Sequence, residues 1–190
     1  MEIHATTRLF ALLGDPVAHS LSPRMLNAAF RASRIDAVYV ALRCSAGDAP
    51  ALLRGIARAG GGGNVTLPHK ETAAAAVDAP TEAVVRTGAC NTFWIEDGRI
   101  RGDNTDVVGF RNARFRLIGE VHGARVLVLG AGGAARAVVW ALLEDGAASI
   151  VVRNRAPARA AALQAALDPP GLRVRVEPWL GRGVDRSAFD

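Results

Sequence analysis

Residues 125–135 read R-V-L-V-L-G-A-G-G-A-A, an apolar run that leads directly into a glycine-rich turn. The pattern predicts a strand over Arg125–Leu129 and a helix over Gly132–Leu143. The turn fits G-x-G-x-x-(G/A) in the strand–turn–helix setting that this pattern requires, so the helix N-terminus is expected to face a pyrophosphate. A glycine-rich turn without a ligand is the alternative. The candidate cofactor-binding residues here are Gly130, Ala131, Gly132, Gly133, Ala134 and Ala135.

Downstream, the same alternation continues. A strand over Ser149–Val152, a helix over Ala156–Leu167 and a strand over Leu172–Val176 complete β-α-β-α-β, the first half of a Rossmann dinucleotide-binding sheet. A complete sheet of this type needs about three more strands. The chain instead ends in a polar stretch, Gly181–Asp190, so we expect a partial nucleotide domain.

The end of the second strand of this block indicates which dinucleotide is bound. Asn154, Arg155 and Arg159 occupy the region where an NAD-binding site usually presents an acid to the ribose. A guanidinium can grip a 2′-phosphate through two parallel hydrogen bonds, whereas a carboxylate would repel it. NADP is therefore favoured over NAD, unless the two arginines are simply solvated residues at a helix start.

Upstream, short apolar runs also alternate with helical patterns. The alternation predicts a mostly parallel sheet covered on both faces, and thus an α/β fold. The tetraglycine Gly60–Gly63 is interpreted as a flexible or tightly turning loop. The expected elements are strands Leu9–Leu13, Ala37–Leu42 and Asn64–Leu67, helices Pro23–Arg34 (capped by Ser22), Ala49–Arg58, one after His69 and one from Thr81, and a hairpin Thr92–Glu96/Arg99–Arg101 turning at Asp97-Gly98.

Composition excludes several classes of protein. The 190 residues contain no apolar run long enough to span a membrane and no N-terminal signal-peptide pattern, so the expected compartment is the cytoplasm. The net charge of +5 comes from scattered arginines with few aromatics between them, which does not indicate nucleic-acid binding. Cys44 and Cys90 are isolated, so we expect reduced thiols and no metal site.

Polar residues gather in four short motifs ahead of the glycine loop. These are H-S-L-S-P (19–23), N-V-T-L-P-H-K (64–70), G-A-C-N-T (88–92) and G-D-N-T-D-V-V-G-F (102–110). They offer hydroxyl and amide groups with few charges, which suits a small polyhydroxylated ligand. Each residue also has a structural interpretation: Ser20 and Ser22 as helix caps, Asn64, Asn91 and Asn104 as turn residues, His19 and His69 as structural hydrogen-bonders, and Asp106 as a residue of a helix start.

The order and spacing of these motifs, followed by G-A-G-G-A-A and N-R-A-P-A-R, resemble the shikimate dehydrogenase family over essentially the whole chain. The resemblance implies NADP-dependent, reversible reduction of 3-dehydroshikimate to shikimate in aromatic amino-acid biosynthesis. It implies a shikimate-binding domain over residues 1–118 and a partial Rossmann domain over 119–190. It also implies the ligand set: Ser20 and Ser22 on the substrate carboxylate, Thr66, Lys70, Asn91 and Asp106 on the ring hydroxyls, with Lys70 and Asp106 as the catalytic pair.

The chain departs from the family in lacking its C-terminal part, including a tyrosine and a glutamine near the substrate. Tyr39 and Gln164, the only residues of their types, lie outside such motifs. A quinate/shikimate dehydrogenase and a non-catalytic remnant that binds shikimate-like acids therefore remain alternatives. The expected assembly is a monomer or a homodimer, with no nucleic-acid or membrane partner.

Lys70 is the only lysine; all the other of the 23 basic residues are arginine. Ketone reduction needs a proton donor beside the carbonyl oxygen, and the reverse reaction must return that proton. Arginine stays protonated in proteins, whereas a partly buried lysine can give up its proton. Lys70 is therefore expected to be the proton-transfer group, held in position by Asp106, although a surface position for Lys70 is the alternative.

Overall fold

The computed structural model describes residues 2–179 and 189. Its contacts divide the chain into two compact units. The first contains the described residues up to Val85 together with Ala89–Asn104, and the second contains Arg86–Gly88 and the described residues from Thr105 onward. The units thus divide between residues 104 and 105, whereas the sequence placed the division between 118 and 119. Among the described residues, no helix combines the length and apolarity that crossing a membrane requires.

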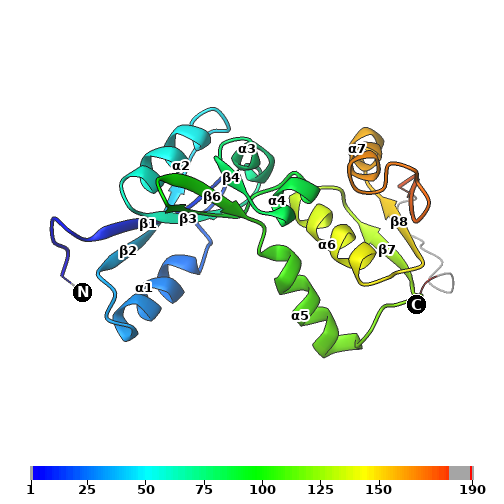
Figure 1. Ribbon diagram of the computed structural model, residues 1–190, viewed down its shortest axis with the longest axis horizontal. Helices are drawn as coiled ribbons and strands as arrows, with labels where there is room; N and C mark the ends of the chain where they lie inside the picture. The colour runs from blue at the N-terminus through cyan, green and yellow to red at the C-terminus, as the bar shows by residue number, and fades with distance from the viewer. Residues whose placement is uncertain (1, 180–188, 190) are drawn as a thin grey trace. The chain divides into compact units, whose positions relative to one another are not determined.

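A six-stranded sheet in the order β2-β1-β3-β5-β6-β4 forms the centre of the first unit (Figure 1). Strand β1 runs parallel to β2 and β3, and β4 runs parallel to β6, whereas β5 is antiparallel to both β3 and β6. The strands are β1 (Arg8–Gly14), β2 (Ala37–Arg43), β3 (Gly62–Val65), β4 (Ala79–Pro80), β5 (Thr92–Glu96) and β6 (Arg99–Asp103). The α/β architecture predicted from the alternation is confirmed, and only the two-residue strand β4 had not been predicted.

Helices cover both faces of this sheet, and α1 and α2 lie on opposite sides of it in Figure 1. On the α2 side, Leu53 packs among buried strand residues such as Leu13 and Phe93. On the α1 side, Leu12 and Tyr39 pack with other apolar side chains in a separate cluster. The helices are α1 (Ser22–Ala32), α2 (Ala49–Arg58), α3 (Lys70–Ala74) and α4 (Glu82–Thr87), whose residues Arg86 and Thr87 belong to the second unit.

The start of α1 differs from the prediction by one residue. Ser22 is the first helical residue and Leu21 is the cap, without a side-chain capping bond. Instead, the Ser22 amide donates to the Ser20 hydroxyl at 3.2 Å. The prediction that Ser22 caps the helix is therefore wrong, and the preceding serine satisfies the first free amide.

The tetraglycine does not form the loop that was predicted over its whole length. Gly62 and Gly63 belong to β3, where Gly63 pairs with Ala11 of β1 on one side and with Phe93 of β5 on the other. A Cβ built on Gly63 would lie 2.0 Å from the Ala11 carbonyl oxygen. Glycine is thus needed here for the close approach of neighbouring backbones, and not for a turn.

The predicted hairpin is confirmed. Strands β5 and β6 pair antiparallel, and the turn residues Asp97 and Gly98 have φ of 51° and 72°. Two consecutive positive φ values are the requirement of the tight hairpin turn that Asp-Gly favours. The hairpin places Asn91, just ahead of β5, beside the end of β3.

The second unit contains the predicted β-α-β-α-β order. Its three parallel strands are β7 (Arg125–Leu129), β8 (Ser149–Arg153) and β9 (Val174–Glu177), and helices α6 (Gly133–Glu144) and α7 (Pro157–Leu167) connect them. Apolar strand residues such as Val128 and Ile150 pack against Leu142 of α6 and Leu163 of α7. Of the predicted polar end, residues 181–188 and 190 lie outside the described part of the chain.

Helix α5 (Asp106–Ile118) had no predicted range, although Asp106 had been considered as a residue of a helix start, which is its position in the structure. Its apolar residues do not form one stripe, and Val108 and Leu117 are exposed. Val107 is buried and Phe110 packs against the core of the second unit. Ion pairs at the end of α6 add to this packing, because Asp145 lies 2.9 Å from Arg111 Nε and 2.9 Å from Arg114. Because the apolar residues of α5 do not follow a regular stripe, apolar periodicity alone did not predict the range of the helix.

Gly63→Ala is expected to lower the free energy of unfolding by about 3 kcal/mol or more, because the added methyl group collides with fixed backbone. Urea unfolding followed by circular dichroism measures this. Gly55→Ala is the matched control, since its Cβ meets nothing within 4 Å on α2. That change should raise stability by about 0.5–1 kcal/mol. Equal, small effects of both changes would show that β3 does not pack as described.

Burial raises the pKa of the Cys90 thiol to about 11 from its ordinary value of 9.0. A raised pKa means that the folded chain holds this proton more tightly than the unfolded chain. The resulting stability is complete below about pH 9 and is lost as the pH rises through about 11.

The free energy of unfolding is therefore expected to fall by about 1 kcal/mol more in the wild type than in Cys90→Ala between about pH 8 and pH 10. Urea unfolding at the two pH values measures the difference. The same pH slope in both proteins would mean that Cys90 is not shielded from water as the structure indicates.

Candidate functional site

Three of the predicted substrate-binding residues line one cavity in the first unit. Its volume is about 470 Å³, within the range of roughly 300–1,000 Å³ typical of small-ligand pockets. It opens where the chain leaves β1 and β3, at the carboxyl ends of these parallel strands, where open α/β sheets bind ligands. The lining residues are Leu12, Pro16, Val17, His19, Ser20, Leu21, Ser22, Thr66 and Leu67.

Backbone hydrogen bonds hold the hydroxyl-bearing residues of this cavity. The Ser20 amide donates to the Val17 carbonyl at 3.0 Å, and the Thr66 amide donates to the Leu13 carbonyl at 2.8 Å. The Ser20 hydroxyl accepts from the Ser22 amide and still carries a proton that it can donate. The cavity therefore offers uncharged hydroxyl groups on a fixed backbone.

Lys70 and Asn91 lie at the same edge of the sheet. Because β5 runs antiparallel to β3, the beginning of β5 lies beside the end of β3, and the Val65 amide donates to the Asn91 carbonyl at 2.8 Å. Lys70 is the first residue of α3, and its carbonyl accepts from the Cys90 amide at 2.8 Å. Thr66, Lys70 and Asn91 are thus brought to one edge by the pairing of two strands.

The predicted pair of Lys70 with Asp106 stays a prediction. Lys70 lies in the first unit, whereas Asp106 is the first residue of α5 in the second. Asp106 lies in the first turn of its helix, where a carboxylate is stabilised by the helix dipole. Both side chains are half-buried.

Tyr39, Asn64 and Thr92 are polar residues beside this edge to which the sequence assigned no site role. The Tyr39 hydroxyl donates to Asn64 Oδ1 at 2.8 Å, and Asn64 Nδ2 donates to Thr92 Oγ1 at 3.1 Å. Asn64 and Thr92 stood within quoted motifs, which was a usable signal. Tyr39 stands in an ordinary apolar strand, where nothing marks it.

His69 is a structural residue. It is 1% exposed, and its Nε2 lies 2.8 Å from the Cys44 carbonyl oxygen. This contact anchors the residue before Lys70 to the loop that follows β2. His19, in contrast, is exposed and lines the 470 Å³ cavity.

A glycine loop with the predicted geometry opens α6 in the second unit. Gly130 has φ of 116°, a conformation that favours glycine, and its amide donates to the Arg153 carbonyl at 2.8 Å. A Cβ on Gly132, the residue ahead of α6, would meet nothing within 4 Å. Open space therefore lies over the backbone at the helix N-terminus, as the close approach of a pyrophosphate requires.

The residues predicted to read the 2′-phosphate follow β8 directly. Since the Gly130 amide is bonded to the carbonyl of Arg153, the next residue, Asn154, starts beside the glycine loop. Asn154 Nδ2 donates to the Ala156 carbonyl at 2.9 Å, which makes a tight turn into α7. Arg155 and Arg159 are exposed at this turn. The described geometry thus fits a dinucleotide whose adenosine end carries an extra phosphate.

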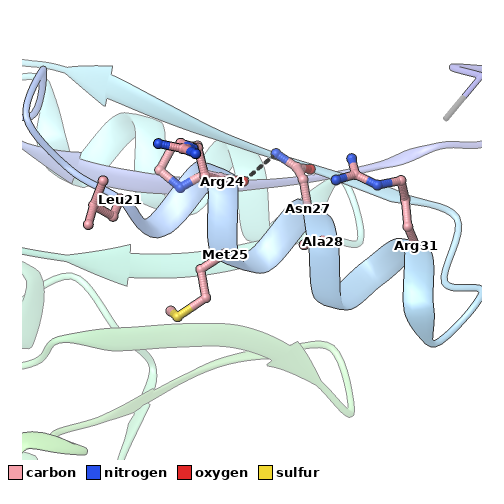
Figure 2. Close-up of a pocket in the computed structure, with 7 residues that line it drawn as sticks. Leu21, Arg24, Met25, Asn27, Ala28 and Arg31 are labelled. Carbon is pink, nitrogen blue, oxygen red and sulfur yellow. Dashed lines mark hydrogen bonds between the residues drawn. The ribbon is translucent and has the colours of Figure 1, made fainter.

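A larger hollow of about 800 Å³ lies along α1 (Figure 2). Of its polar side chains, Asn27 is bonded to the Pro23 carbonyl, as the dashed line in Figure 2 shows. None of the predicted site residues contributes to its walls, which are Leu21, Pro23, Arg24, Met25, Asn27, Ala28 and Arg31. The smaller cavity at the strand ends has the convergent hydroxyl groups and is the better candidate.

Comparison with protein families and known proteins agrees with this geometry. Residues 12–93 match the family model "Shikimate dehydrogenase substrate binding domain", and residues 113–175 match "Shikimate / quinate 5-dehydrogenase". The shikimate dehydrogenase (NADP(+)) of Moorella thermoacetica is 45% identical over 191 residues, which cover 100% of this chain and 65% of that protein. The chain thus spans slightly less than two thirds of that relative's length.

Solved structures show the same likeness. A shikimate 5-dehydrogenase of Thermus thermophilus in complex with shikimate is 38% identical with a TM-score of 0.75, and the match covers 94% of this chain and 71% of that one. A structure of the enzyme from the same organism with NADP(H) and shikimate is 42% identical with a TM-score of 0.75, covering 88% and 62%. The chain belongs to the shikimate dehydrogenase family.

Proposed function

We propose that this chain provides the shikimate-binding and nucleotide-binding elements of an NADP-dependent oxidoreductase that reversibly reduces 3-dehydroshikimate to shikimate in aromatic amino-acid biosynthesis. The observation that carries the proposal is the cavity in which Ser20, Ser22 and Thr66 converge at the carboxyl ends of β1 and β3. The names of the matched relatives support the same reaction.

The cavity suits a small ring acid with several hydroxyl groups. Hydroxyl side chains both donate and accept, so Ser20 and Ser22 can hold a carboxylate while Thr66 and Asn91 meet ring hydroxyls. A strongly apolar ligand would leave these groups without partners, at a cost of roughly 1–3 kcal/mol each. Substrate recognition therefore rests mainly on uncharged side chains, with the charged Lys70 and Asp106 completing the set.

Lys70 is the proposed proton-transfer group. In the reductive direction its ammonium donates a proton to the substrate oxygen as charge develops there, and in the oxidative direction its amine takes the proton back. Asp106 would hold that ammonium in position. Bound NADPH supplies the hydride.

The second unit is the proposed NADP site. Residues 130–135 would bind the pyrophosphate through backbone amides, and Asn154, Arg155 and Arg159 would bind the adenosine ribose and its 2′-phosphate. The free space over Gly132 and the exposed arginines at the β8–α7 turn support this assignment.

We also propose a cytoplasmic monomer or homodimer without nucleic-acid or membrane partners. The buried cysteines, Cys44 and Cys90, are both free thiols, which suits a reducing compartment.

Lys70→Arg tests the proton-transfer role. The rate of NADP-dependent shikimate oxidation should fall by about 100-fold or more, because arginine keeps its charge but cannot release a proton. Absorbance of NADPH follows the rate, and calorimetry should find the shikimate Kd within about threefold of the wild type. Arg31→Lys, at an exposed site on α1, is the control and should change neither quantity. Retention of the rate within about threefold in Lys70→Arg would remove Lys70 from the mechanism.

Replacing Arg155 and Arg159 together by alanine tests the cofactor assignment. The NADP Kd should rise by about tenfold or more while the NAD Kd changes less than about twofold, because the lost bonds are to the 2′-phosphate. Calorimetry with both nucleotides gives the two constants. Arg175→Ala is the control, because Arg175 is exposed on β9 of the same unit. Equal weakening of NADP and NAD would contradict the assignment.

A further inference from the structure

A line of polar side chains crosses the sheet of the first unit on the α1 side. It starts at Tyr39 on β2 and passes over β1 to Asn64 on β3, although β1 lies between these strands. Two strand spacings are about 9–10 Å, so a side chain as long as tyrosine is needed to bridge them. The Tyr39 ring packs with Leu12 of β1 on the way, and Tyr39 is only 3% exposed.

The hydrogen bonds along this line have a fixed direction. Tyr39 donates to Asn64 Oδ1 at 2.8 Å, which turns Asn64 Nδ2 toward the Thr92 hydroxyl at 3.1 Å. Thr92 then donates to Asn91 Oδ1 at 2.9 Å. Because Thr92 donates to Asn91 Oδ1, the Asn91 amide is oriented with its oxygen toward Thr92 and its NH2 end away from Thr92.

The other end of the line reaches α1. Asn27 Nδ2 donates to the Tyr39 carbonyl at 2.8 Å, and the Tyr39 amide donates to Asn27 Oδ1 at 2.9 Å. The same Asn27 amide group donates to the Pro23 carbonyl in the first turn of α1, the contact drawn in Figure 2. Tyr39 is thereby tied to the helix start that carries Ser22 as well as to Asn91.

Burial also keeps Tyr39 in the form that the line requires. It raises the pKa of the Tyr39 phenol from 10.0 to about 12, so the hydroxyl remains a neutral donor well above neutral pH. A phenolate could not donate to Asn64.

We infer that Tyr39 is a positioning residue of the proposed substrate site: its hydroxyl, acting through Asn64 and Thr92, sets the orientation in which the Asn91 amide meets a ring hydroxyl of the substrate. The inference rests on the proposed function for the identity of that substrate. Tyr39 touches no substrate atom in this account and acts only through the side chains that follow it.

A double-mutant cycle on the full chain tests the inference. Tyr39→Phe keeps the ring and removes the donor, and Thr92→Val keeps the shape and removes the hydroxyl. Each change should raise the shikimate Kd, measured by calorimetry, by about 3–10-fold. The shikimate Kd of the double variant should be about equal to the higher Kd of the two single variants, because both changes interrupt the same series of hydrogen bonds. Thr92→Ser, which retains a hydroxyl, should restore binding to within about twofold.

Phe30→Leu is the control for loss of packing. Phe30 packs against the same cluster on the α1 side, beside Phe10 at a ring distance of 5.4 Å, and is not part of the polar line. The Phe30→Leu change should lower the Tm at least as much as Tyr39→Phe does, and should leave the shikimate Kd unchanged. Unchanged binding in Tyr39→Phe, multiplying effects in the double variant, or equal loss of binding in Phe30→Leu would each overturn the positioning role.

NMR signals of the Asn91 side-chain amide separate this inference from the proposed function. Wild-type chain that fails to bind shikimate would refute the proposed function. The Asn91 signals of ligand-free protein then decide the positioning role by themselves. They should move in Tyr39→Phe and keep their positions in Phe30→Leu, and Asn91 signals that Tyr39→Phe leaves in place would overturn the inference.

Discussion

The close fit of β3 between β1 and β5 is the constraint on which the candidate substrate site depends. A Cβ on Gly63 would lie 2.0 Å from a β1 carbonyl oxygen, and one on Gly62 would lie 2.6 Å from the β5 carbonyl oxygen of Phe93. Strand β3 is parallel to one neighbour and antiparallel to the other. Its end therefore meets both the loop after β1 and the start of β5, and so brings Thr66 and Asn91 to one edge.

Apolar periodicity predicted most of the fold. Helix α2 and strand β7 have the predicted limits. Helix α2 buries a regular pattern of apolar side chains, and β7 is a short apolar run that ends at a glycine turn. The pattern failed where long-range contacts replace it. Gly62 and Gly63 looked like a loop, because what requires glycine there is the backbone of other strands. The range of α5 was not predicted, because its apolar residues form no regular stripe and ion pairs with Asp145 add to their packing.

The residues of the candidate site could be predicted where they stand in recognisable sequence motifs. They could not be predicted where their contacts depend on which residues the pairing of strands places side by side. Ser20, Ser22 and Thr66 share a cavity, and the glycine loop has the expected opening over Gly132. The contribution of Tyr39 could not be predicted, because it depends on which residue two strands away faces the same side of the sheet. The pairing of Lys70 with Asp106 stays a prediction, since the two residues belong to different units.

The central claim is that a polyhydroxylated ring acid binds at the carboxyl ends of β1 and β3. Backbone amide NMR of the isotope-labelled chain, titrated with shikimate, tests it most directly. The account predicts that shifted signals gather at residues 19–22, 64–70 and 91–92, the segments that surround the cavity and its edge. Signals that stay in place at all three segments, or that move only along the outer hollow of α1 at residues 24–31, would contradict it.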